Sequence, residues 1–155
     1  MTINALKISK IEDNVQSLVQ CSASASTELL WNDNKWKMNR PSLFAKNSKV
    51  YEFAGKEEVN ALKDPNSLSF VYIYHPDCPY CKKSAPEWEQ FAQDFEESYR
   101  GSVMKVGAIN LSDERNRKDP LPGQKFGSFL DAIGPIKTVP TIKLFKDGQE
   151  IKYDN

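Results

Sequence analysis

The chain has 155 residues, of which 39% are hydrophobic and 27% charged, so it is long enough to bury one sizeable core as a soluble domain. Lys and Arg together number 21, as do Asp and Glu, so no net charge draws the protein to nucleic acid or to an acidic membrane surface. We accordingly expect neither a nucleic-acid nor a membrane partner, and the composition leaves the oligomeric state open.

Apolar segments are short throughout the sequence. Residues 1–30 hold no stretch long enough for a signal-peptide core, and the longest apolar-rich run, Phe70 to Tyr74, is too short to span a bilayer. We therefore expect a cytoplasmic or other non-secretory location. Three cysteines are too few for a disulfide scaffold, but Cys78 and Cys81 stand at C-x-x-C spacing, which indicates redox or metal chemistry.

Residues 1–48 are predicted to form an N-terminal extension. Its first part, about residues 4–20, is expected to be an amphipathic helix, because apolar residues recur there at helical spacing. These residues are Ile8, Ile11, Val15 and Leu18. A Ser/Ala-rich joint, Ser22 to Thr27, separates this helix from an irregular segment, Leu29 to Ser48, whose scattered aromatic residues are expected to act as apolar anchors, at a place that the sequence does not specify.

From residue 49 to residue 155 the pattern predicts one α/β domain, in which short strands alternate with helices. The expected order is βαβαβ followed by a hairpin. The strands are expected at 50–53, 68–75, 103–111, 141–145 and 149–153, and the helices at 56–63 and 82–99, the second with a kink at Pro86. The Pro/Gly-rich region 112–139 is expected to be loop, except for helical character over 124–133.

The cysteine pair directly follows a buried strand and opens a helix. Cys78 then lies beside the free amides and the positive dipole end of that helix, which favour thiolate over thiol, so Cys78 is the candidate nucleophile. Cys81, almost one turn further on, can attack the mixed disulfide that Cys78 forms and release the product. Pro79 and Tyr80 lie between the two cysteines and are expected to tune the reduction potential of the pair without reacting themselves. This chemistry requires no metal and no organic cofactor.

Several ordered blocks of the sequence resemble the thioredoxin superfamily. The stretch from Phe70 to Phe91, which contains Cys-Pro-Tyr-Cys, is similar to the active-site strand and helix of that family, and Cys81 to Trp88 is similar to protein disulfide isomerase domains. The segment 103–111 resembles the family's third strand, and 138–148, with Thr-Val-Pro, resembles its cis-proline loop and hairpin. The resemblance implies a thioredoxin-like fold, in which helices flank a central mixed sheet.

The same resemblance implies a function for individual residues. Pro140 would be cis and would lie against the Cys78 sulfur, and the backbone of Val139 would offer hydrogen bonds to a bound polypeptide. We therefore predict a thiol–disulfide oxidoreductase that acts on protein substrates, with Cys78 and Cys81 as catalytic residues. The residues predicted to bind substrate are Val139, Pro140, Pro79 and Tyr80. The sequence does not predict whether the exchange reduces, oxidises or isomerises its substrates.

The chain also departs from this family. Tyr72 stands where the family usually carries a buried acid, and Asp77 stands where an aromatic residue usually precedes the first cysteine. The negative charge of Asp77 opposes thiolate formation at Cys78. Both departures favour an alternative function, a catalytically weak module that holds a partner polypeptide at the cis-proline groove. Glutathione specificity is a minor alternative, because the Gly-Gly segment of glutaredoxins is absent.

The sequence ends after the last predicted strand, where the family adds a final helix. We predict that the N-terminal amphipathic helix covers that face of the sheet instead, because an uncovered apolar face would be a large exposed patch. A partner subunit is the competing explanation.

Two further residues, His75 and Cys21, leave alternatives open. His75, the only histidine, could stabilise a thiolate or shuttle a proton, or it could be a strand-end residue satisfied by backbone groups. His75, Cys78, Cys81 and Cys21 could together supply a tetrahedral zinc site, but one C-x-x-C pair is only half of such a site, so we expect no metal. Cys21 is read as a bystander or as a thiol open to modification or dimerisation.

Overall fold

The computed structural model describes residues 27–28, 40–65, 67–98, 104–116 and 138–151. The helix predicted over residues 4–20 and the helical segment predicted over 124–133 lie outside the described residues, so packing of the N-terminal helix on the sheet stays a prediction. Within the described residues, no helix is long and apolar enough to cross a membrane.

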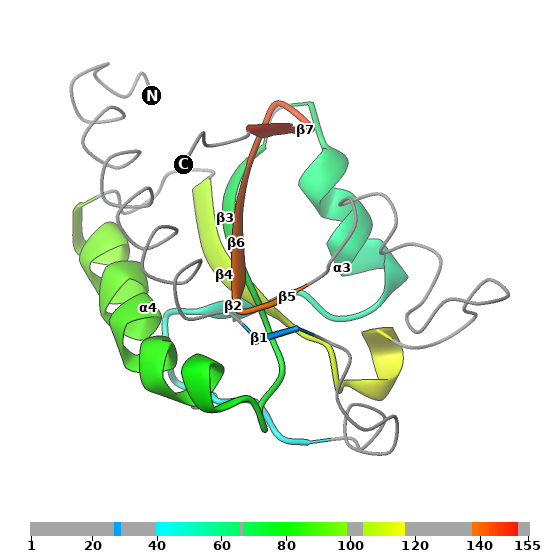
Figure 1. Cartoon of the computed structure of the whole chain (residues 1–155). Coiled ribbons are helices and arrows are strands. Elements are labelled where there is room, and N and C mark those ends of the chain that lie inside the picture. The colour runs from blue at the N-terminus through cyan, green and yellow to red at the C-terminus, as the bar shows by residue number, and fades with distance from the viewer. Residues whose placement is uncertain (1–26, 29–39, 66, 99–103, 117–137, 152–155) are drawn as a thin grey trace, which may run out of the picture.

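A five-stranded mixed sheet forms the centre of the fold, as the sequence predicted (Figure 1). Its strand order is β2-β4-β3-β6-β7, with β3 parallel to β4 and antiparallel to β6. The strands are β2 (Tyr51–Glu52), β3 (Leu68–Tyr74), β4 (Met104–Asn110), β6 (Thr141–Lys146) and β7 (Gln149–Ile151). Two further short strands, β1 (Thr27–Glu28) and β5 (Thr138–Val139), pair with each other in a separate ladder.

Helices lie on both faces of the sheet (Figure 1). On one side, α3 (Lys56–Asn60) continues as the 3-10 turn η1 (Ala61–Lys63) and ends at Asp64, whose extended conformation suits the residue before a proline. On the other side, α4 (Pro79–Ser98) continues through Pro86. It begins three residues before the predicted start at Lys82, because the fixed φ of Pro79 suits the first helical turn. A last 3-10 turn, η2 (Glu114–Asn116), follows β4.

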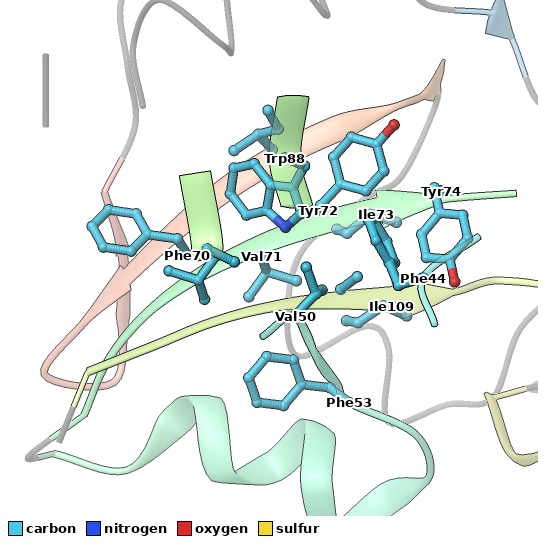
Figure 2. Packing of buried hydrophobic residues seen from close by; sticks show 14 of the residues in the cluster. Phe44, Val50, Phe53, Phe70, Val71, Tyr72, Ile73, Tyr74, Trp88 and Ile109 are labelled. Carbon is cyan, nitrogen blue, oxygen red and sulfur yellow. The ribbon is translucent and has the colours of Figure 1, made fainter. Parts of the chain in front are cut away.

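Aromatic packing holds α4 to the sheet. Tyr72 on β3 stacks on Trp88 of α4 with ring centroids 5.6 Å apart, and Phe70 meets Phe91 edge-on at 5.7 Å. The indole nitrogen of Trp88 donates to the carbonyl of Gly107 at 3.0 Å, so its polar group is satisfied inside the core. Phe53 packs on the opposite face, as Figure 2 shows. This packing fixes the start of α4, and with it the cysteine pair, relative to the end of β3.

Residues 40–44, which belong to the predicted extension, also pack against the domain. Phe44 is buried and makes edge-on contacts with the rings of Tyr72 and Tyr74 at 5.9 and 5.5 Å. The segment therefore docks through an aromatic anchor, as expected for one of its scattered aromatic residues.

Candidate active site

The two cysteines occupy the junction between β3 and α4. The amide of Cys78 donates to the carbonyl of His75 at 3.0 Å, and the Cys78 carbonyl accepts from Lys82 at 3.0 Å, which is the first hydrogen bond of the helix. Cys78 is thus the residue that precedes α4, and Cys81 lies in its first turn. Both thiols are reduced and buried, with Cys78 only 1% exposed.

The two sulfurs interact directly. A hydrogen bond to Cys78 and burial together raise the pKa of the Cys81 thiol far above its usual value. Cys81 therefore keeps its proton near neutral pH, which is compatible with its predicted role as the cysteine that resolves the mixed disulfide.

The cis-proline loop lies against the first cysteine. The Val139–Pro140 peptide bond is cis, as the resemblance implied, and both residues are buried. The Cys78 thiol donates to the Val139 carbonyl, with sulfur and oxygen 3.8 Å apart. The other two predicted substrate-binding residues, Pro79 and Tyr80, are exposed to solvent, and the exposed fraction of Tyr80 is 43%.

A phenol occupies the position of the missing acid. The Tyr72 hydroxyl donates to the Cys81 carbonyl at 3.0 Å and contacts the hydroxyl of Ser84, which in turn donates to the Tyr80 carbonyl at 2.9 Å. Burial raises the pKa of Tyr72 above its ordinary value. Tyr72 is therefore neutral near pH 7, so it can hold the first turn of α4 in place but cannot take a proton from Cys81.

His75 is buried at the end of β3 and is engaged by the turn that follows. Its Nδ1 accepts from the amide of Asp77 at 3.1 Å, so the proton of the neutral ring is on Nε2. This contact favours the reading in which backbone groups satisfy the ring. Among the residues that the structure describes, no group of three or more His, Cys, Asp or Glu side chains could hold a metal ion, and Cys21 lies outside those residues.

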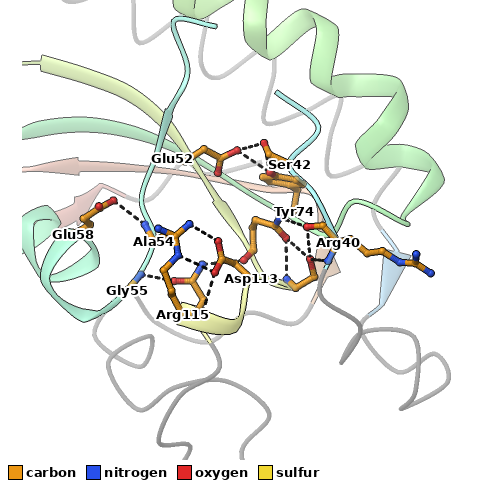
Figure 3. A network of polar contacts seen from close by, with 12 residues as sticks. Arg40, Ser42, Glu52, Ala54, Gly55, Glu58, Tyr74, Asp113 and Arg115 are labelled. Atoms are coloured by element: carbon orange, nitrogen blue, oxygen red, sulfur yellow. Dashed lines mark hydrogen bonds and ion pairs between the residues drawn. The ribbon is translucent and has the colours of Figure 1, made fainter. Parts of the chain in front are cut away.

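Arg40 is a neighbour of the site that the sequence did not point to. Its Nε lies 3.1 Å from Oδ2 of Asp77, and the two side chains are 41% and 28% exposed. Two hydrogen bonds hold the Arg40 backbone beside the C-terminal end of β4. Its amide donates to the hydroxyl of Ser112 at 3.0 Å, and its carbonyl accepts from the side chain of Asn110 at 3.0 Å (Figure 3). Arg40 thus places a positive charge on the carboxylate that precedes Cys78.

A second contact fixes the same segment. The hydroxyl of Tyr74 donates to Glu52, at 2.9 Å, and lies 2.9 Å from the hydroxyl of Ser42, which also hydrogen-bonds with Glu52 (Figure 3). Burial raises the pKa of Glu52, and the two hydroxyl donors partly offset this effect. Residues 40–44 are therefore tied both to β2 and to the end of β3 from which the cysteines follow.

The Arg40–Asp77 pair should tune the reactivity of Cys78. We expect Asp77→Asn to speed alkylation of Cys78 at pH 7 about threefold and Arg40→Gln to slow it about threefold, because each change alters one partly exposed charge near the sulfur. The rates are measured with iodoacetamide and mass spectrometry in a Cys21→Ser background.

The control for these two variants is Lys46→Gln, which removes a positive charge from an exposed side chain of the same segment. It should leave the alkylation rate unchanged. Equal slowing in Lys46→Gln and Arg40→Gln would mean that net charge, and not the pair with Asp77, governs the rate.

No protein-family model matches the chain. Its sequence is similar to the probable protein disulfide-isomerase A4 of Caenorhabditis elegans, with 32% identity over 89 residues, or 57% of this chain and 12% of that protein. The protein disulfide-isomerase A4 of Bos taurus is 27% identical over 100 residues, or 64% of this chain and 13% of that protein. The chain thus spans about an eighth of the length of these two relatives.

A solved structure adds a likeness in fold. The zinc-bound form of human ERp44 matches 67% of this chain with a TM-score of 0.50 and 15% sequence identity, and the match covers 25% of that chain. The protein therefore has a thioredoxin-like α/β fold with a C-x-x-C pair at the start of its long helix, and its sequence is similar to parts of protein disulfide isomerases.

Proposed function

We propose that the protein is a thiol–disulfide oxidoreductase that exchanges a dithiol for a disulfide with protein substrates through Cys78 and Cys81. The observation that carries this proposal is the position of the Cys78 sulfur, between the start of α4 and the Val139 carbonyl of the cis-proline loop. The helix start favours the thiolate, and the loop offers a backbone beside it on which a polypeptide can be aligned.

The first step forms a mixed disulfide. The Cys78 thiolate attacks one sulfur of a substrate disulfide, a bond forms between the two sulfurs, and the substrate's S–S bond breaks. The second substrate sulfur leaves as a thiolate and takes up a proton from water. The tightly held proton on Cys81 matters here, because it keeps Cys81 from competing for the substrate.

The second step releases the product. Once Cys78 is in a mixed disulfide, it no longer shares a proton with Cys81, and the largest cause of the raised pKa of Cys81 is removed. Cys81 then loses its proton to solvent, and its thiolate attacks the Cys78 sulfur, so that the Cys78–Cys81 bond forms and the remaining substrate sulfur leaves. Two electrons pass from the dithiol to the substrate, and the same steps in reverse oxidise a substrate dithiol.

The sequence comparisons support protein disulfides as the substrate class, because the similar relatives are named as protein disulfide isomerases. Those relatives are several times longer than this chain, so their activity as whole proteins is carried over here only as a proposal.

The reduction potential of the Cys78/Cys81 pair tests the function and gives its direction. The protein, as Cys21→Ser, is equilibrated in defined glutathione buffers, and free thiols are counted by mass spectrometry. A value near about −270 mV would indicate a reductase, and one near about −180 mV or higher an oxidase or isomerase. If no disulfide joins the two cysteines at any ratio of glutathione to its disulfide, the catalytic function is wrong.

A second function, a weakly reactive module that holds a partner polypeptide, is favoured by two observations. Cys78 is nearly inaccessible in this structure, and Tyr72 provides no base for Cys81. Alkylation kinetics separate the two functions. A Cys78 thiol that reacts no faster than free cysteine near neutral pH would support the binding module, whereas faster reaction would support exchange.

A further inference from the structure

The cis-proline loop already has a strand paired to it. Strand β5, Thr138–Val139, pairs antiparallel with β1, Thr27–Glu28, with Thr27 opposite Val139 and Glu28 opposite Thr138. Figure 1 shows these two strands side by side at the lower end of β6, and their pairing forms a ladder separate from that of the five-stranded sheet. A segment from the N-terminal part of the chain is therefore added to the loop that borders the cysteine pair.

Val139 is the residue that this ladder shares with the catalytic site. Its carbonyl lies 3.8 Å from the Cys78 sulfur, and the same residue is in register with Thr27. Both residues of β5 are in the ladder, so an extended polypeptide that adds to β5 has to compete with β1 for this backbone. The low exposure of Cys78, 1%, agrees with a site that is not open to a large substrate in this arrangement.

We propose that Thr27–Glu28 is an intramolecular strap, which occupies the strand-addition edge of β5 in place of the substrate polypeptide. The inference rests on the proposed function, and it adds a regulation of the site, the competition between the substrate polypeptide and the chain's own strand. The protein then exists in two states, one in which β1 is paired with β5 and one in which β5 is unpaired. A substrate reacts only with the fraction of molecules in which β5 is unpaired.

The shortness of the ladder makes such displacement feasible. Only two residues pair on each side, and an isolated two-stranded ladder of this kind is marginally stable in water. A substrate segment that pairs with the same backbone and forms a disulfide bond with Cys78 can therefore replace the strap.

The test removes the backbone donors of the strap. The double variant Thr27→Pro with Glu28→Pro lacks both amide hydrogens, whereas Thr27→Ala with Glu28→Ala keeps them and is the matched control. Both are made in the full chain as Cys21→Ser. Each protein is mixed with an extended peptide whose single cysteine carries a thionitrobenzoate disulfide, and release of the coloured thiolate gives the rate of attack by Cys78.

We expect the proline variant to react about tenfold faster than the alanine variant, the increase expected if the open state is a minor population of about 10% or less. The alanine variant should react like the parent. Equal rates in the proline and alanine variants would overturn the strap and leave the proposed function standing.

Hydrogen exchange tests the strap independently of the reaction with the peptide. If none of the proteins reacts with the peptide, that result counts against the proposed function and not against the strap. Of the backbone amides of Thr138 and Val139, the one that faces β1 should exchange faster in the proline variant than in the alanine variant, while those of β3 should be equal in the two. The equality at β3 confirms that both variants are folded. No difference at residues 138–139 would overturn the strap.

Discussion

Replacement of Cys78 by serine should abolish disulfide exchange while the protein stays folded. A serine hydroxyl keeps its proton near neutral pH and cannot form the sulfur–sulfur bond of the mixed disulfide, so the rate should fall to that of the uncatalysed reaction. The new hydroxyl is about the size of the thiol and can donate to the same Val139 carbonyl, so the cost in stability should be at most about 1 kcal/mol. Reduction of a disulfide-bonded peptide, followed by mass spectrometry, measures the loss.

Serine at Cys81 is the matched variant, and it should fail at the second step. Cys78 can then attack, but nothing releases the product, so a stoichiometric mixed disulfide between Cys78 and the peptide should accumulate. Cys21→Ser should retain the full rate. A mixed disulfide trapped at Cys81 in Cys78→Ser would mean that the two cysteines have the opposite roles.

Replacement of Gly107 by alanine should cause a large loss of stability. A Cβ atom on Gly107 would lie 2.3 Å from Cε2 of Phe53 and 2.4 Å from the backbone carbonyl of Tyr51. The carbonyl belongs to β2, which pairs with β4 at this residue, so the strand itself would have to shift. We expect a loss of about 3 kcal/mol in the free energy of unfolding, measured by urea denaturation.

Gly55→Ala separates this clash from the effect of losing a glycine as such. Gly55 has a φ of 88°, a region that side chains disfavour, yet its nearest neighbour would be the Cβ of Arg115 at 3.9 Å. The change should therefore cost about 2 kcal/mol for the backbone conformation alone. If the two substitutions cost the same, Phe53 and β2 do not approach β4 as closely as described, and the packing of that face is wrong.

The parts of the site that local sequence determines were predictable. A buried run of aromatic and β-branched residues, followed at once by the cysteines and by a helical pattern, was enough to predict β3, the turn and α4. The cis bond at Pro140 followed from the resemblance and not from the residues themselves. The start of α4 was placed too late, because apolar spacing is visible only from Lys82 onward, whereas Pro79 and Tyr80 are exposed in its first turn.

Contacts between distant segments were not predictable from the sequence. Arg40 is 37 residues from Asp77 and lies in a segment without any period, so no local signal marks it as a neighbour of the site. The hydrogen bonds that join Ser42 to Glu52 and Tyr74 also connect residues that are far apart in the sequence, so no local pattern predicts them. Strand β1 is two residues long, and alternation cannot be recognised over so short a stretch.

The candidate active site joins parts of the fold that differ in local stability. Cys78 follows β3, the central strand, which has ladders on both sides and packs between two layers, and such strands open only when the whole domain unfolds. Val139, on the other side of the sulfur, belongs to a two-residue ladder that can open alone at small cost in free energy. The nucleophile is thus held in a fixed position while the backbone beside it exchanges partners, so binding need not disturb the geometry of the reacting sulfur.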